Sequence, residues 1–583
     1  MLANEAYNRT GNLNGIGYAT IKVPWVQGLS YTATYSKTLN TNETGSFYGF
    51  NTYQGLAPKG TGSRAYSRGT ATLFDHLIKY NRTYFDKHNV DLTLLHSDQN
   101  TVAYGESLSA NGFDNDQLGT YRLSAGAIQA VSTSGSETKS IGQMARLTYT
   151  YDGKYSVTGT IRHDGYSAFS NNHKYGNFSS VGANWNISKE KFMENVNLFN
   201  SLALRASYGT NGNQSIAPYS TLSKITNGYY YYQGDANYTY TQAVGTLGND
   251  DLVWESTTGL NFGLDFSILK NRLSGSIDGY ATRTNNLAFT LELPGASGFT
   301  SITANAGEIQ NRGLEMNLRS VNISNKKFTW RSEAAFALNR NKVTHLLGDK
   351  NGDGKEDDIV SSNLFIGKSL GVVYNYEVEG MWQQSDKDAG TIMTGFQPGT
   401  YKLRDVNGDG KITSDSDRVF LGNSGANFRW SLTNTFTYGN WSLLVYINSI
   451  WGGGNYFING SNTPWNDAYA NRGDMNHPIY DYWTPTNTNA EFPRPSYTSK
   501  ASVRAPKYYD RSFIRLQKLG LSYEATKFVK KYGIQGLNVS LSADNLGTYA
   551  PKWIGLDAAT GNGLTVSSIP SLRNIMMNFN INF

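Results

Sequence analysis

Two short segments rich in Asp, Asn and Gly carry the residue types best suited to bind a ligand. In the first, Asp405, Asn407 and Asp409 place side-chain oxygens at alternate positions, and Gly410 follows where a sharp turn is needed. This spacing matches the first half of a calcium-binding loop, in which the backbone carbonyl of Lys411 would supply the next oxygen. The segment therefore predicts a structural Ca²⁺ site.

The second half of this segment departs from the calcium pattern. Its twelfth position is Ser416 where a calcium loop has Glu, so the closing carboxylate would have to come from Asp415 or Asp417. The alternative is a turn that closes through its own side-chain hydrogen bonds and needs no metal. Both interpretations stay open, and no other cofactor is required.

A second segment repeats only the first half of the pattern. Asp349, Asn351 and Asp353 alternate before Gly354, but the twelfth position is Val360. Calcium has less support here than in the first segment. Bound calcium would rigidify either loop, and neither segment suggests catalysis.

Other residues that commonly carry chemistry form no recognisable constellation. The chain has no Cys, which excludes thiolate metal sites, disulfides and cysteine nucleophiles. Its seven His show no HExxH motif, and there is no GxSxG motif. His163 alternates within an expected strand and is most simply one of its side chains. The net charge of +6 is spread without a dense Lys/Arg run, so nucleic-acid binding has little support. We expect no enzymatic activity.

The composition favours a large β-sheet as the element that positions these loops. Gly (61), Tyr (40) and Phe (26) are abundant, Pro is only 13, and charged residues make up 16%. No stretch of about 18 apolar residues is present, so any membrane crossing would need a closed barrel. The mean hydropathy of −0.47 allows this, because spanning strands alternate apolar and polar residues.

Period-two alternation is the organising signal. At 145–151, Ala145, Leu147, Tyr149 and Tyr151 alternate with polar residues, and Asp152-Gly153 then turns the chain into a second alternating segment at 155–161. The same pattern recurs at 181–187, 202–208, 260–268, 273–277, 441–447 and 537–541. The alternation yields roughly 14 to 16 strand candidates.

Connections of two lengths join these strands. Short turns lie at one end, whereas long connections rich in Asn, Gly, Ser and Tyr lie at the other, at about 209–256, 342–370 and 452–507. This asymmetry is typical of outer-membrane barrels. The alternative is a secreted β-solenoid or propeller, but no repeat of about 40 residues joins the hairpins. We expect an all-β, transmembrane antiparallel barrel.

The last strand carries a distinctive ending. Its apolar positions are Ile575, Met577, Phe579, Ile581 and Phe583, and the chain ends on that Phe. The ending Phe579, Ile581, Phe583 resembles the sorting signal that the barrel-assembly machinery reads. The alternative is a buried final strand that happens to end on an aromatic residue.

Several strings resemble the SusC/RagA family of TonB-linked outer-membrane proteins, in the order that family uses. They are RLTYTYDGKYSVTGTIRHDGYSAF (146–169), LALRASYGTNGNQ (202–214), DDLVWESTTGLNFGLDF (250–266), NAGEIQNRGLEMNL (305–318), DVNGDGKIT (405–413), DYWTPTNTNAEFPRP (481–495), YYDRSFIRLQKLGLSY (508–523) and NVSLSADNL (538–546). The resemblance spans nearly the whole chain, and the co-linear succession is more specific than any single string.

The resemblance implies most of a barrel of about 22 strands that also carries an N-terminal plug and a TonB-binding segment. No plug, TonB box or signal peptide is recognisable in the sequence. We therefore expect residues 1–583 to be the C-terminal part of one such barrel in a Gram-negative outer membrane, with Met1 marking a truncated or internally started reading frame. An unclosed barrel would leave unpaired strand edges in lipid.

The resemblance also implies an activity and partners. The intact protein would import an oligosaccharide or a peptide together with a SusD-like lipoprotein. TonB-ExbB-ExbD would drive this import through the N-terminal part that the resemblance implies. Alternatives are a siderophore-type receptor or passive porin, and a surface adhesin. Aromatic residues such as 229–232, Trp451, Trp465 and Trp483 could stack on sugars, but membrane-interface belts are the commoner reason for them in a barrel.

Overall fold

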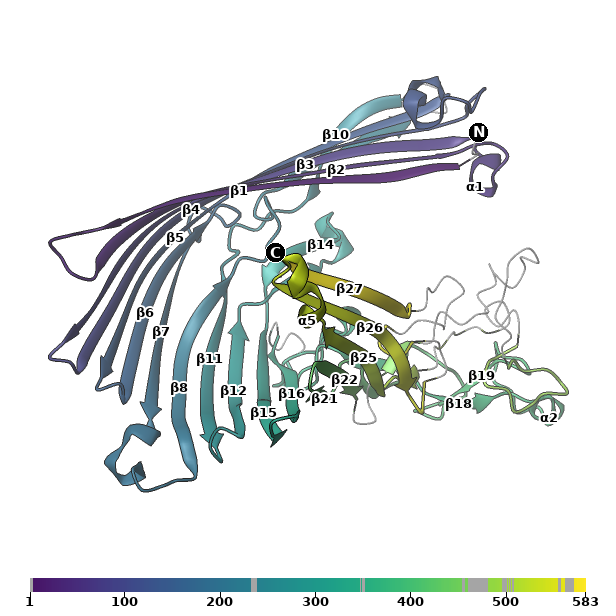
Figure 1. The fold of residues 1–583 in the computed structure, drawn as a ribbon. Coiled ribbons are helices and arrows are strands. Elements are labelled where there is room, and N and C mark those ends of the chain that lie inside the picture. The colour runs from purple at the N-terminus through teal and green to yellow at the C-terminus, as the bar shows by residue number, and fades with distance from the viewer. Residues whose placement is uncertain are drawn as a thin grey trace. The chain divides into compact units, whose positions relative to one another are not determined.

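The structure is a computed structural model in which nearly all regular structure is β (Figure 1). It describes residues 4–231, 238–346, 348, 352–452, 457–459, 481–494, 501, 503, 505, 508–553, 557–560 and 571–583. Within these ranges, seventeen strands belong to one sheet, slightly more than the alternation predicts. No helix in the described ranges is long and apolar enough to cross a membrane.

The large sheet comprises seventeen of the described strands. They are β1 (Asn4–Lys22), β2 (Leu29–Tyr48), β3 (Thr61–Tyr84), β4 (His88–Asn111), β5 (Ile128–Tyr151), β6 (Tyr155–Tyr166), β7 (Tyr175–Asn186), β8 (Phe199–Asn213), β11 (Glu255–Ile268), β12 (Leu273–Asn285), β15 (Glu308–Ser324), β16 (Phe328–His345), β21 (Phe428–Tyr438), β22 (Trp441–Trp451), β25 (Phe513–Glu524), β26 (Gly536–Tyr549) and β27 (Asn574–Asn582).

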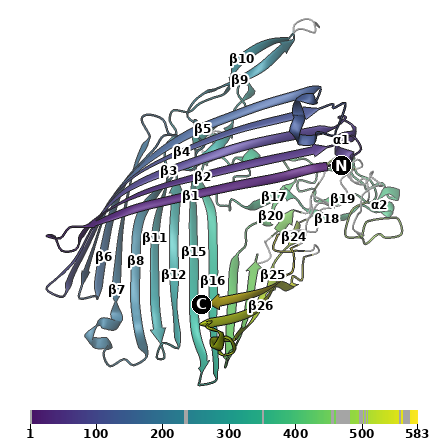
Figure 2. The same ribbon diagram turned by 45° about the horizontal axis from the view of Figure 1, so that its top comes forward.

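Smaller strand pairs and short helices occupy the connections, as Figure 2 shows for β9 and β10. The pairs are β9 (Lys224–Tyr231) with β10 (Tyr238–Thr246), β13 (Ala288–Glu292) with β14 (Ser301–Asn305), β17 (Val372–Tyr376) with β20 (Arg418–Asn423), β18 (Val378–Met381) with β19 (Tyr401–Leu403), and β23 (Phe457–Asn459) with β24 (Tyr508–Asp510). The helices are α1 (Tyr53–Leu56), η1 (Gly119–Ala125), η2 (Ile187–Lys189), η3 (Lys191–Met193), η4 (Gly295–Ser297), η5 (Val360–Ser362), α2 (Gln384–Asp388), α5 (Thr526–Val529) and η6 (Lys530–Tyr532).

The chain divides into two compact units, which we describe separately. Unit 1 comprises Met1–Asn186, Ala206–Leu260 and Arg283–Glu308. In it, β1 to β7 form a continuous antiparallel ladder in sequence order. Asp152 and Gly153, both at positive φ, make the tight turn between β5 and β6, as their sequence predicts.

Unit 2 comprises Ile187–Arg205, Asn261–Thr282 and Ile309–Phe583. Its strands β16, β21, β22, β25, β26 and β27 pair in that order, again antiparallel. The C-terminal strand pairs with β26 along its full length, from Asn574 to Asn582. Strands that follow one another in the sheet also follow one another in sequence, with loops between them.

Strands β3, β4 and β5 are far longer than a membrane requires. Each has 24 residues, whereas a spanning strand needs about 9–11. Sequence alternation identified none of β1 to β4, and the first half of β1 carries mostly polar residues on both faces. A capping cluster of Phe47, Ala110 and Phe113 packs at the distal ends of β2 and β4.

The long connections differ in their bounds from the sequence expectation. The predicted loop at 209–256 contains the β9–β10 hairpin, and that at 452–507 contains β23. The predicted loop at 342–370 overlaps the end of β16, and the connection that follows runs on to β21. Part of that connection folds around its own core of Trp382, Phe396, Tyr401 and Leu403, with Ala505.

Candidate functional site

One face of the unit 1 ladder is apolar and exposed. Leu147, Val157 and Val181 are each about half exposed, at 49%, 51% and 52%. The cross-strand register places Leu147 opposite Leu92 on one side and Gly159 on the other, with Val181 opposite Gly159. Exposed aliphatic rows across adjacent strands are what a lipid-facing surface requires.

An aromatic row borders this apolar face at the short-turn end. Tyr84 lies opposite His88, His88 opposite Tyr151, Tyr151 opposite Tyr155, and Tyr155 opposite Trp185. Such rings have an apolar body and a polar tip, so they favour the boundary between hydrocarbon and water. The row therefore marks one edge of a membrane-embedded band.

Unit 2 repeats the arrangement on its own strands. Leu443, Leu521, Leu541 and Met577 form one continuous cross-strand row from β22 to β27. Two residues nearer the turn between β21 and β22, Tyr438 lies opposite Trp441, and Trp441 lies opposite Tyr523. The ring centroids of Trp441 and Tyr523 are 4.6 Å apart. In the last strand, Ile575 lies opposite Ala543, Met577 opposite Leu541 and Phe579 opposite Val539, so these alternate apolar residues continue the apolar rows of β26. The role of the last strand as a sorting signal stays a prediction.

The opposite face of unit 2 carries charges. Arg205 donates to Asp265, with Nε 2.6 Å from Oδ2, and to Asp278, with Nη2 3.1 Å from Oδ2. Gly263 makes room for this bridge, because a Cβ there would lie 2.7 Å from the Arg205 guanidinium carbon and 2.6 Å from an Asp278 oxygen. The three charged groups hold one another on the polar face.

A polar depression of about 480 Å³ lies on the wall of unit 2 beside Asp265. Ser274, Ser276, Arg319 and Glu333 contribute to its lining, with Ser431 and Thr433 from β21. The Arg319 Nε and Glu333 Oε1 atoms are 3.5 Å apart and both side chains are largely exposed. Such a surface can exchange hydrogen bonds with a polar solute, whereas the apolar face cannot.

The segment predicted to bind calcium forms a compact loop closed by its own carboxylates. Asp405 accepts from the backbone N–H groups of Gly408 and Gly410, each at 2.8 Å. Fully buried Asp417 accepts from Val406 N at 2.9 Å and Thr413 N at 2.7 Å. These backbone donors occupy oxygens of both carboxylates.

The other predicted side-chain ligands of this loop accept fewer backbone hydrogen bonds than Asp405 and Asp417. Asp409 accepts from Asn407 Nδ2 at 3.0 Å and from Lys411 N at 2.8 Å, while Asp415 accepts from Ser414 Oγ. In the described part of the chain, no three His, Asp or Glu side chains gather closely enough to hold a metal ion. The geometry accounts for the loop as a self-closed turn, and calcium binding stays a prediction.

The second predicted calcium segment is only partly visible. Asp349 and Asn351 lie outside the described residues, and Asp353 accepts from the backbone N–H of Lys355 at 2.9 Å. Of the aromatic candidates for sugar stacking, Trp483 is buried and donates from Nε1 to Gln383. Trp451 stacks on Phe428, with ring centroids 6.5 Å apart, and Trp465 lies outside the described residues. Trp483 is a core residue, so its buried ring offers no face to a sugar.

A buried ion pair ties the loop after β26 to the sheet. Arg515 donates to Asp557, and both side chains are less than a tenth exposed. Burial alone would raise the pKa of Asp557, but hydrogen bonds from Ser571, Arg515 and the Ala559 backbone outweigh it and hold that pKa below its ordinary value. This pair anchors the loop in its observed position.

Comparison with known proteins decides between the interpretations of this surface. The family described as "TonB dependent receptor-like, beta-barrel" matches residues 3–546. The chain belongs to the TonB-dependent receptor β-barrel family. It is an outer-membrane β-barrel protein, so the exposed apolar face lies against lipid and the opposite, polar face lines the lumen.

Relatives place the chain in the SusC/RagA group, as its motifs suggest. TonB-dependent receptor P3 of Formosa agariphila is 31% identical over 96% of this chain and 57% of its own length. TonB-dependent receptor SusC of Bacteroides thetaiotaomicron is 26% identical over 76% of this chain and 44% of its own length. The chain thus spans less than two thirds of these relatives.

Solved structures show the same fold. The structure of the RagAB peptide transporter covers 100% of this chain with a TM-score of 0.79 and 22% identity, and this chain covers 63% of it. The RagAB peptide importer in the "open-open" state gives a TM-score of 0.80. The expected barrel fold is confirmed.

Sequence reasoning missed a polar row on the lipid-facing side of unit 1. His76 lies opposite His96, His96 opposite Gln143, Gln143 opposite His163, and His163 opposite Asn177. Alternation placed His163 correctly in a strand, but it could not show that three distant His align. The register of β3 and β4 was the missing information, since neither strand was identified.

Proposed function

We propose that the chain is the barrel part of a TonB-dependent importer that takes up an oligosaccharide or a peptide together with a SusD-like surface lipoprotein. The observation that carries the proposal is the co-linear similarity to SusC over 454 residues. A fold shared with the RagAB peptide transporter supports the same class of activity. The charged lumen wall around Arg205 suits a polar solute.

The proposal includes parts beyond the 583 residues. We infer that the whole protein also has a plug and a TonB-binding segment through which TonB-ExbB-ExbD supply energy, and that the barrel-assembly machinery inserts it. Its relatives' greater length supports this layout. We further infer that it acts in transport and catalyses no reaction, because the family model that it matches describes receptors.

Growth on single nutrients tests the importer proposal. A strain that lacks the gene should lose growth on one oligosaccharide or peptide class, and a strain that lacks TonB function should show the same loss. Purification of the tagged full-length protein should recover a stoichiometric lipoprotein. Uptake that persists without TonB would instead indicate a passive porin, and restoration by iron alone would indicate a siderophore-type receptor. Unchanged growth on every nutrient with impaired surface attachment would indicate an adhesin.

A further inference from the structure

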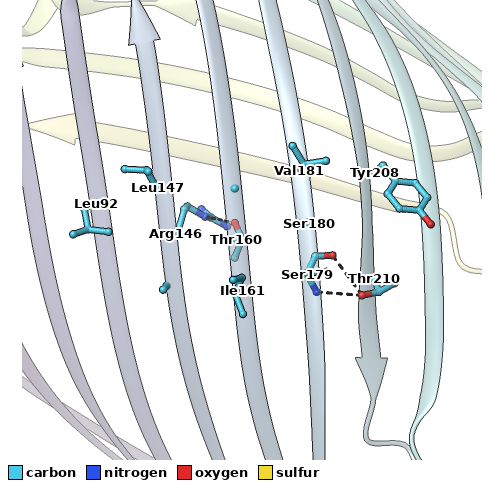
Figure 3. A pocket seen from close by; sticks show the side chains of 12 residues that line it. Leu92, Arg146, Leu147, Thr160, Ile161, Ser179, Ser180, Val181, Tyr208 and Thr210 are labelled. Atoms are coloured by element: carbon cyan, nitrogen blue, oxygen red, sulfur yellow. Dashed lines mark hydrogen bonds between the residues drawn. The ribbon is translucent and has the colours of Figure 1, made fainter.

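The lipid-facing side of unit 1 has a groove where its aliphatic rows are interrupted. The groove has a volume of about 460 Å³, and Gly159 is one of its lining residues. Leu147 and Val181, both labelled in Figure 3, lie opposite Gly159 on the two neighbouring strands. No atom beyond its chain neighbours comes within 4 Å of where a Cβ on Gly159 would be. Leu92, Ala145, Ile161 and Tyr208 also line the groove, and Ser179 and Thr210 are among its polar lining residues.

The groove lies between two boundaries of the membrane-embedded band. On its short-turn side is the aromatic row of Tyr151 and its neighbours, and on its other side is the polar row that contains Gln143. Tyr151 and Gln143 are eight residues apart on β5, which is about 26 Å along the strand. A strand tilt of about 40° reduces this to about 20 Å, close to the height of the apolar band in such barrels.

The polar row presents groups that both donate and accept hydrogen bonds. His163 Nδ1 lies 2.7 Å from Asn177 Oδ1, and Gln143 Nε2 lies 3.4 Å from His96 Nδ1. His96 Nε2 is also 2.9 Å from Asp98 Oδ2. This row lies at the long-loop side of the band, which in an outer-membrane barrel is the outer leaflet.

Aromatic and charged groups surround the polar row. Exposed Tyr175 stacks on His163 with centroids 5.1 Å apart, and Phe74 packs against His76. Lys139 pairs with Glu137 at 3.3 Å, and Asp98 adds a second carboxylate beside His96, so no excess of Lys or Arg surrounds this row. Mixed donors and acceptors beside exposed ring faces suit a sugar better than a bare phosphate.

We propose that this side of unit 1 binds one outer-leaflet glycolipid, with its sugar headgroup on the row formed by His96, Gln143 and His163 and one acyl chain in the groove at Gly159. The occupant follows from position, because the groove opens toward the hydrocarbon and the polar row faces the headgroups directly above it. The site depends on membrane insertion and is independent of what the barrel transports.

Lipid retention by the full-length receptor tests the proposal. The protein is delipidated in mild detergent, lipid A or phosphatidylethanolamine is added back, and bound lipid is counted by native mass spectrometry. Gly159→Leu should lower lipid A retention about tenfold, as expected if about two methylene groups of the acyl chain are no longer buried in the groove. Ala145→Leu fills the same groove from β5 and should act likewise.

Gly69→Leu is the matched control. Gly69 is another strand glycine with open space around a Cβ, but it lies on the opposite face, between Asn40 and Ala103. It should leave lipid A retention unchanged. Folding of every variant is checked by its heat-modifiable mobility on gels.

His163→Ala separates the headgroup from the acyl chain. We expect it to lower lipid A retention and to leave phosphatidylethanolamine retention unchanged. Equal loss of both lipids in His163→Ala would overturn the sugar assignment, and unchanged lipid A retention in both folded groove-filling variants would overturn the site as a whole. Neither result depends on import activity.

Discussion

At the scale of single residues, Asp417 organises the loop between β19 and β20. Its carboxylate is fully buried and accepts two backbone hydrogen bonds, from Val406 and Thr413. In Asp417→Asn, an amide N–H₂ must face one of those N–H donors. We expect a local cost of about 1–3 kcal/mol, measurable as faster hydrogen exchange at 405–417.

Asp415→Asn is the matched control for Asp417→Asn. Asp415 is exposed and accepts only from Ser414 next to it, so exchange should stay near wild type. Equal protection in the two variants would show that burial of Asp417 does not organise the loop.

The calcium prediction is tested on the same loop. If Asp405, Asn407 and Asp409 bind Ca²⁺, millimolar calcium should slow hydrogen exchange at 405–417 relative to a chelator, and Asp409→Ala should abolish the difference. If the loop is closed by its own hydrogen bonds alone, calcium and chelator should give the same exchange rates. Magnesium serves as the control cation.

The buried pair of Arg515 and Asp557 gives a prediction with a defined pH dependence. Asp557→Asn leaves the buried guanidinium without its counter-charge and should cost about 3–5 kcal/mol of unfolding free energy in a denaturant titration. The lowered pKa of Asp557 means that its contribution is complete above the ordinary Asp value and is lost as pH falls through the folded-state pKa.

The difference between wild type and Asp557→Asn should therefore stay constant from about pH 5 to pH 8 and shrink only below about pH 4. A difference that shrinks between pH 5 and pH 8 would show that another group titrates with this pair.

At the scale of elements, the two faces of a strand should respond oppositely to charge. Leu521 lies between Leu443 and Leu541 on the lipid-facing side, so Leu521→Lys should cost about 2–4 kcal/mol of unfolding free energy in lipid. Ser522 is its neighbour on the lumen face, where Ser522→Lys should cost far less. Equal costs would show that the face assignment of β25 is wrong.

Strands with one apolar face could be predicted from sequence, whereas strands polar on both faces could not. The β5–β6 hairpin is visible because Leu147 and Val157 alternate with polar residues around Asp152-Gly153. The first half of β1 lacks this contrast, and its pairing with β2 rests on backbone hydrogen bonds and tertiary context. The row of His76, His96 and His163 was also hidden, because only the register reveals it.

At the scale of the whole molecule, the motifs predicted the family and fold, and neither composition nor alternation could predict the substrate. Substrate recognition is shared among loops, the lumen wall and partners, so no single residue pattern encodes it. The predicted calcium ligands illustrate the limit. Asp405 and Asp417 lie in one loop, but burial and backbone donors, which spacing does not encode, decide how their oxygens are used.

The central claim is that one face of this sheet lies against lipid and the other against an aqueous lumen. Because the chain has no Cys, single-cysteine spin labels can be placed at each position of 157–161 on β6 in the outer-membrane protein. We predict a period of two: labels at 157, 159 and 161 should be relaxed mainly by oxygen, and labels at 158 and 160 by a water-soluble nickel chelate. Uniform relaxation by the nickel chelate along 157–161 would contradict the account.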